Sequence, residues 1–132
     1  MNKSLNIYSG GKGLAAALTN PTWLAKVKGN LSQSYPVSLG AMIFRDAEEA
    51  YQALKNGDTL HDDELMVLII CEKFTQYQDL LTQVKTLGGA DFLKTCRHFV
   101  NAKTIRGKSW EGIGMESRFI RNLVAGYLKA VT

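Results

Sequence analysis

The sequence is poor in the residues that build disulfide frameworks and metal sites, with two cysteines and two histidines among 132 residues. Cys71 and Cys96 do not form a CxxC pair, and Cys71 lies inside an apolar run, so we predict free thiols. His61 and His98 are far apart and show no metal-ligand spacing. We therefore predict that both histidines lie at the surface or are internally hydrogen-bonded, and we predict no metal site and no cofactor.

Long hydrophobic segments and common catalytic motifs are also missing. The longest apolar run, residues 66–71, is far shorter than the roughly 20 residues that cross a bilayer, so no membrane span is predicted. Residues 1–6 lack the apolar core of a signal peptide, and we expect a cytoplasmic protein. No GxxxxGKS/T, GxGxxG, GxSxG or HExxH pattern occurs, which argues against the corresponding nucleotide-binding and hydrolase classes.

What the sequence does contain predicts one predominantly helical α+β domain over residues 1–132. The apolar content of 45% is enough for one hydrophobic core at this length. A small N-terminal hairpin is predicted from residues 37–39 and 41–44 around Gly40. A short strand at 5–8 and helical turns at 14–18 and 23–27 precede it. Longer helices are predicted at residues 46–55, 59–74, 76–87, 90–98 and 116–130.

Local signals predict where several of these helices begin and how they pack. Asp46 is the expected N-cap of the helix at 46–55. Thr59 and Asp62 match a capping box for the next helix, whose apolar residues cover most of its circumference and predict a central, buried element. Gly126, inside the last helix, predicts either the close approach of another element or a tolerated cost of ~1 kcal/mol.

The helix at 46–55 carries a polar row that is a candidate binding or catalytic surface. Glu48, Gln52 and Lys55 follow one another at helical spacing, beside Tyr51 at the border of the apolar face. A carboxylate at such a border is partly desolvated, which raises its pKa and suits proton transfer. The alternative is a solvated polar edge stabilised by side-chain pairs along the helix.

The segment from 103 to 121 is the second candidate site. Its glycines allow close backbone approach to a ligand, and Trp110 offers a flat face for a nucleobase. Arg106, Lys108 and Arg118 are candidate phosphate contacts, in keeping with a net charge of +4. The alternatives are an ordinary loop with its tryptophan anchored in the core, and scattered basic residues that only keep the surface solvated.

Taken together, these segments resemble the NADAR, or YbiA-like, family over nearly the whole chain. The resemblance begins with Asn-Ile-Tyr-Ser at 6–9, Leu-Thr-Asn at 18–20 and Tyr-Pro-Val at 35–37, and continues through 44–55. Gln-Ala-Leu-Lys at 52–55 stands at the family's Gln-Ala-x-Lys, and Lys-Phe-Thr-Gln at 73–76 matches its Lys-Phe-x-Gln. Trp-Glu-Gly at 110–112 is similar to its Trp-Gly segment.

The resemblance implies a YbiA-like fold and a function. Family members hydrolyse N-glycosidic bonds in ADP-ribosylated or phosphoribosyl compounds, so the expected ligand is a nucleotide or an ADP-ribosyl adduct such as ADP-ribosyl-guanosine. Glu48 is then the candidate catalytic carboxylate. The implied substrate-binding residues are Asn20, Gln52, Lys55, Lys73 and Trp110, with Arg106, Lys108, Arg118 and Arg121 available for the pyrophosphate.

The chain departs from the family pattern at acidic positions. Glu49 replaces the family's histidine, and acidic residues expected near Thr95 and shortly before Trp110 are missing. Glycosidic cleavage often uses two carboxylates, so Glu111 or Glu49 would have to supply the second one. Two alternatives stay open: a module that binds an ADP-ribose-like nucleotide without cleaving it, and a small basic protein that interacts with DNA or protein.

Overall fold

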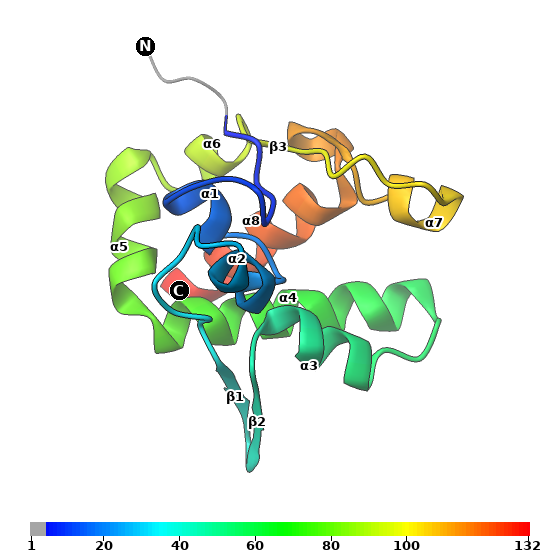
Figure 1. Ribbon diagram of the computed structural model, residues 1–132, viewed down its shortest axis with the longest axis horizontal. Helices are drawn as coiled ribbons and strands as arrows, with labels where there is room; N and C mark the ends of the chain where they lie inside the picture. The colour runs from blue at the N-terminus through cyan, green and yellow to red at the C-terminus, as the bar shows by residue number, and fades with distance from the viewer. Residues whose placement is uncertain (1–4) are drawn as a thin grey trace.

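The computed structural model describes residues 5–132. The signal-peptide prediction concerned residues 1–6, of which residues 1–4 lie outside the described part of the chain. Figure 1 shows the order of the elements, with helices around a central pair and a hairpin that extends from the body. The helices are α1 Leu14–Ala17, α2 Thr22–Val27, α3 Ala47–Leu54, α4 Thr59–Gln76, α5 Gln78–Leu87, α6 Ala90–Leu93, α7 Ile105–Lys108, the 3₁₀ turn η1 Gly114–Glu116 and α8 Arg118–Val131. The strands are β1 Val37–Leu39, β2 Met42–Phe44, β3 Arg97–His98 and β4 Gly112–Ile113. The prediction of a predominantly helical α+β fold with a small hairpin is confirmed.

Helices α4 and α8 form the centre of the core. Most of the apolar face of α8 is buried, including Phe119, Ile120, Leu123, Val124 and Tyr127, while Leu128 and Val131 near its end are partly exposed. Gly126 lets the two backbones approach, since a Cβ there would lie 2.5 Å from Cγ2 of Ile70 and 3.1 Å from the carbonyl oxygen of Val67. The close approach predicted at this glycine is therefore present, and any side chain would have to displace α4.

The start and the solvent-facing side of α4 differ from prediction. Asp58, rather than Thr59, caps the helix by accepting a hydrogen bond from the backbone N–H of His61. Asp62 does not close a capping box, because its carboxylate turns back to accept bonds from the N–H groups of Asn56 and Gly57. Leu68 is 45% exposed, so α4 is buried along one broad face rather than around its circumference.

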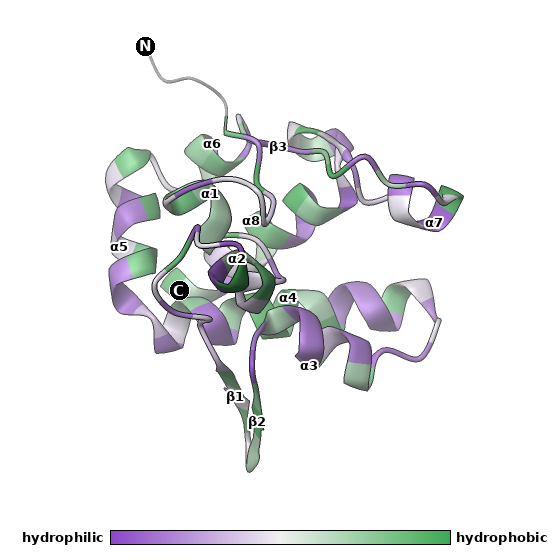
Figure 2. Cartoon of the chain, in the orientation of Figure 1, coloured by the Kyte–Doolittle hydropathy of each residue, from purple (hydrophilic) through white to green (hydrophobic). Residues whose placement is uncertain are grey.

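The N-terminal hairpin forms where the alternation predicts it. Strands β1 and β2 pair antiparallel, with Val37 opposite Phe44 and Leu39 opposite Met42. Gly40 takes a φ of 59°, a conformation that side chains disfavour. The hairpin projects away from the helices, and Figure 2 shows hydrophobic residues along it. Ile43 is 76% exposed at this projection.

The predicted helix at 90–98 is wrong in its second half. Helix α6 ends at Leu93, and β3 then pairs antiparallel with β4. The predicted strand at 5–8 is reduced to one parallel bridge between Asn6 and Arg97, with the N–H of Ile7 2.9 Å from the carbonyl oxygen of Arg97. The physical reason is tertiary: two distant segments supply the backbone partners that the helical turns after Leu93 would otherwise supply internally.

The remaining helices follow the sequence pattern with small changes at their ends. Helix α3 is capped by Asp46, which accepts a hydrogen bond from the N–H of Glu49. Helix α5 buries Leu80 and Val84, and Gly88 and Gly89 end it with positive φ angles. Helix α8 begins two residues later than predicted, after Ser117 caps it and η1 precedes it. Within residues 5–132, no helix is long and apolar enough to cross a membrane.

Candidate functional site

One pocket of about 800 Å³ opens between the two segments that the sequence singles out. Its walls come from the turn before α2, from α3 and the start of α4, and from the stretch between β3 and the first turn of α8. Figure 1 shows why these segments meet: α7 and the α3–α4 turn lie at the same end of the molecule. The volume falls within the range of about 300–1,000 Å³ that is usual for small-molecule sites.

Glu48 faces this pocket from the first turn of α3. The helix starts where it does because Asp46 is buried and accepts two backbone bonds, from the N–H of Glu49 at 2.8 Å and from that of Trp23 at 2.9 Å. Glu48 is half-buried, and its carboxylate accepts a hydrogen bond of 2.7 Å from Nε2 of Gln52. The polar row predicted on this helix therefore exists, and Glu48, Gln52 and Lys55 all line the pocket.

Asn20 lines the same pocket and leaves one polar atom unmatched. Its side chain is only 5% exposed, and Nδ2 lies 2.9 Å from the sulfur of Met66. Within the described chain, Oδ1 of Asn20 is a buried oxygen with no hydrogen-bond partner. Buried polar groups are nearly always paired in folded proteins, so an unmatched oxygen on a residue of the pocket wall is an exception that singles out Asn20.

Trp110 lines the pocket, and one face of its ring is already covered. The guanidinium of Arg118 lies 4.0 Å from the ring centroid, and Nε of Arg118 donates to Oδ1 of Asp63 at 2.6 Å. Tyr51 meets the same ring edge-on at 5.7 Å, and burial raises the pKa of the Tyr51 hydroxyl. A stacked base would have to use the other face of Trp110 or displace Arg118.

The basic residues divide into two groups. Arg106, Arg118 and Lys55 line the pocket, whereas Lys108 and Arg121 do not. Arg121 instead donates through Nη1 to the carbonyl oxygens of Met115 and Glu116, and so holds the turn before α8. Arg106 is solvent-exposed on α7 and is therefore available to a phosphate at the mouth of the pocket.

Lys73 lies behind the pocket rather than in it. Its ammonium is 3% exposed and donates to the carbonyl oxygens of Ala17 and Thr19, at 2.6 and 2.8 Å. Burial lowers the pKa of Lys73 to about 7, and the charge of Asp46 opposes this shift only in part. Because Thr19 and Asn20 belong to the pocket wall, Lys73 supports the site from the core side.

Glu111, the expected second carboxylate, is engaged in holding a loop. It does not line the pocket, and its Oε2 accepts bonds from the N–H groups of Val100 at 2.6 Å and Ala102 at 3.2 Å. The bond from Val100 is the main reason that the pKa of Glu111 lies below its usual value. Glu49 also points elsewhere and pairs with Arg45. Neither residue supplies a second acid to the pocket.

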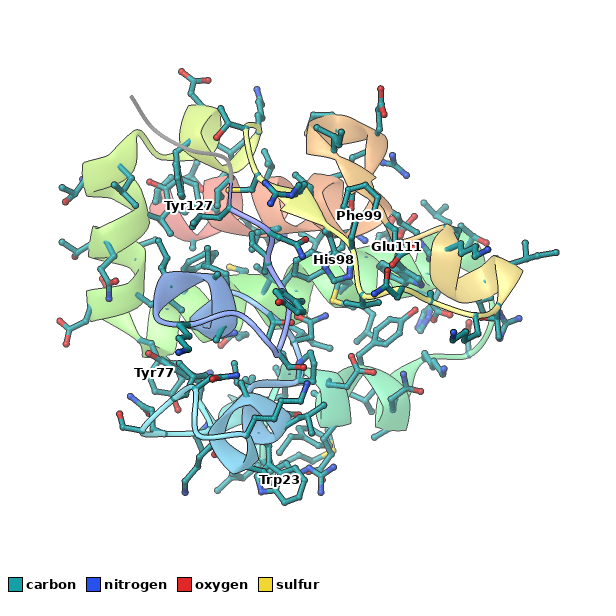
Figure 3. All side chains as sticks on the ribbon, turned by 45° about the horizontal axis from the view of Figure 1, so that its top comes forward. Trp23, Tyr77, His98, Phe99, Glu111 and Tyr127 are labelled. Carbon is teal, nitrogen blue, oxygen red and sulfur yellow. The ribbon has the colours of Figure 1, made fainter. Side chains whose placement is uncertain are left out.

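His98 lines the pocket, although the sequence predicted only a surface or internally hydrogen-bonded histidine and no role in a site. It lines the pocket from β3, with its ring 4.6 Å from that of Phe119 and Nδ1 2.6 Å from the carbonyl oxygen of Ile7. Figure 3 shows His98 beside Glu111 and far from Trp23. Its place depends on the β3–β4 pairing, which the sequence pattern does not reveal, so no local signal would have identified it.

Asp62 is the only acidic residue besides Glu48 on the described pocket wall, and it is fully occupied. Burial raises the pKa of Asp62, but the bonds from His61, Asn56 and Gly57 outweigh this and lower it overall. Among residues 5–132, no group of three or more His, Cys, Asp or Glu side chains gathers in a way that would hold a metal ion.

No family model, curated protein or solved structure matches this chain.

Proposed function

We propose that this protein is an N-glycoside hydrolase that acts on ADP-ribosylated or phosphoribosyl nucleotide adducts, with Glu48 as the proton-transfer group. The observation that carries the proposal is the meeting of Glu48, Trp110 and Arg106 around one pocket of about 800 Å³. A carboxylate, an aromatic face and a cation are the groups that the sugar, base and phosphate of such a ligand require.

The reaction needs one proton to travel from water to the leaving base. Water adds its hydroxyl to the anomeric carbon while the bond from that carbon to the base nitrogen breaks. The released proton passes to the Glu48 carboxylate and from there to the departing nitrogen, so the enzyme ends in its starting state. Gln52, which donates to Glu48 at 2.7 Å, orients the carboxylate for this transfer.

The resemblance to the NADAR family supports the same reading, because its candidate catalytic carboxylate corresponds to Glu48. It also supports Asn20, Gln52, Lys55 and Trp110 as ligand contacts, since all four line the pocket. Lys73 is proposed as a support for the wall at Thr19 and Asn20. Lys108, Arg121 and Glu111 are not proposed as ligand contacts, because they lie off the pocket wall.

A second candidate function is binding without cleavage. It is favoured by the absence of a second free carboxylate from the described pocket wall, where Asp62 is held by two backbone N–H groups. On this reading the pocket holds an ADP-ribose-like nucleotide and releases it unchanged.

A product screen separates the two functions. The purified protein is incubated with a panel of ADP-ribosyl nucleosides, ADP-ribosyl-guanosine among them, and the products are identified by mass spectrometry. Release of a free base or nucleoside together with ADP-ribose supports the hydrolase. Calorimetric binding of ADP-ribose with every adduct left intact supports the binding module, and neither binding nor cleavage contradicts both.

A further inference from the structure

The imidazole of His98 is a further polar group of the pocket wall, and its one hydrogen bond leaves the second ring nitrogen available to a ligand. His98 comes from β3, its Nδ1 is taken by the carbonyl oxygen of Ile7 at 2.6 Å, and it lines the pocket. We propose that His98 is a ligand-binding residue that accepts a hydrogen bond through Nε2 from a hydroxyl group of the bound sugar. This inference rests on the proposed function for the identity of the ligand, but not on its cleavage.

The contact with Ile7 fixes the tautomer. A carbonyl oxygen can only accept, so Nδ1 must carry the proton, and in the neutral ring Nε2 then carries a lone pair. Within residues 5–132, Nε2 makes no hydrogen bond to the protein, while the ring is held in place against Phe119. An imidazole that is held through Nδ1 and belongs to a residue of the pocket wall has Nε2 left to accept from a ligand.

The surroundings keep this ring neutral. Burial lowers the pKa of His98, and the hydrogen bond to Ile7 and the charge of Glu111 oppose that shift only in part. The carboxylate of Glu111 accepts hydrogen bonds from the backbone N–H groups of Val100 and Ala102 and not from the His98 ring. The acceptor lone pair of Nε2 is therefore present at neutral pH, when an unburied histidine would be partly protonated.

Asn20 adds an independent acceptor to the same pocket. Its amide nitrogen faces the sulfur of Met66, which leaves Oδ1 as a buried oxygen unpaired with any described residue. Asn20 and His98, on segments far apart in sequence, thus both line the pocket, and each carries one acceptor atom that no described residue pairs. A ribosyl group supplies several hydroxyl donors in a small volume, whereas an apolar ligand would leave both atoms unmatched.

Two substitutions separate ligand binding from a merely structural role. His98→Asn keeps an amide near the position of Nδ1, able to donate to Ile7, and removes the Nε2 acceptor. His98→Gln places its amide oxygen near the position of Nε2 and gives up the bond to Ile7. Affinity for ADP-ribose is measured by calorimetry for the wild type and both variants between pH 5 and pH 7.5.

We expect the Asn variant to bind ADP-ribose about tenfold more weakly than the wild type, because the ligand hydroxyl group loses its acceptor on binding. The Gln variant should bind more tightly than the Asn variant. Wild-type affinity should fall on acidification, as protonation removes the lone pair, and both variants should lose that dependence. Wild-type-like binding by the Asn variant, the reverse order of the two variants, or no ADP-ribose binding by the wild type would each overturn the inference.

A measurement on the wild type avoids any effect of the substitutions on folding. Nitrogen-15 shifts should show a protonated Nδ1 and a bare Nε2 in His98, and the Nε2 resonance should move when ADP-ribose is added. An Nε2 that is protonated or insensitive to ADP-ribose refutes the role of His98. Cleavage of ADP-ribosyl-guanosine is scored separately, so the hydrolase can fail while His98 still binds, or the reverse.

Discussion

Replacing Lys73 by methionine tests the account of how the core supports the pocket wall. The Lys73 ammonium donates to two buried carbonyl oxygens, those of Ala17 and Thr19, at 2.6 and 2.8 Å. Methionine preserves most of the packing of the side-chain stem but leaves both oxygens unpaired. Two unpaired buried acceptors cost about 2–6 kcal/mol together, but the variant is also free of the cost of about 3 kcal/mol that releasing the Lys73 proton on folding imposes on the wild type at pH 8. We therefore expect the two free energies of unfolding to lie within about 3 kcal/mol of each other at pH 8, with the variant losing stability relative to the wild type as the pH rises.

The pH dependence of this effect follows from the lowered pKa. Between the folded value of about 7 and the ordinary value of 10.5, the unfolded chain holds a proton on Lys73 that the folded protein has released. Stability therefore rises with pH in this window, at up to about 1.4 kcal/mol per pH unit. The neutral amine still has two N–H groups, one for each carbonyl oxygen, so both bonds survive deprotonation.

The assay is chemical denaturation of the wild type and of Lys73→Met at pH 7, 8 and 9. The free energy of unfolding of the wild type should rise by about 2 kcal/mol relative to that of the variant from pH 7 to pH 9. Cys96, whose pKa is raised by burial, titrates in the same way in both proteins and cancels from the difference. A stability difference that stays constant with pH, or one that shifts in favour of the variant as the pH rises, would refute the reasoning.

Two further substitutions test the packing of α4 on α8 and the unmatched oxygen in the pocket. Gly126→Ala should lower the free energy of unfolding by about 1–3 kcal/mol, because the new methyl group would lie 2.5 Å from Cγ2 of Ile70. Thermal or denaturant unfolding measures this change, and an unchanged midpoint would contradict the tight packing of α4 on α8. Asn20→Leu should leave the unfolding midpoint equal to or above that of the wild type, because it removes a buried, unpaired oxygen, while calorimetry should show loss of ADP-ribose binding. A large drop in stability with binding intact would contradict the role given to Asn20.

The sequence predicted those parts of the fold that depend on neighbouring residues. Asp46 caps α3 because its side chain reaches an N–H three residues away, and Gly126 stands where α4 approaches α8. Both are visible in the helical pattern itself. The sequence pattern puts the N-cap of α4 one residue too late, at Thr59, because the Asp62 carboxylate accepts from the N–H groups of Asn56 and Gly57 and does not close a capping box.

The parts that could not be predicted depend on distant partners. The strand at Arg97–His98 exists because Gly112–Ile113 and Asn6 pair with it, and nothing within residues 90–98 indicates those partners. The same limit applies to the site. Glu48 could be selected from helical spacing and from the family resemblance, but the presence of His98 in the pocket and the engagement of Glu111 by Val100 and Ala102 are tertiary facts.

The central claim is that Glu48 transfers the proton in the pocket, and single-turnover cleavage of ADP-ribosyl-guanosine tests it most directly. Glu48→Gln keeps the shape of the side chain and removes its basicity. Glu49→Gln is the matched control, since that carboxylate pairs with Arg45 and does not line the pocket. We predict a rate at least about 100-fold lower for Glu48→Gln, in line with the loss of general acid–base catalysis, and a near wild-type rate for Glu49→Gln. Cleavage by Glu48→Gln at the wild-type rate would contradict the account.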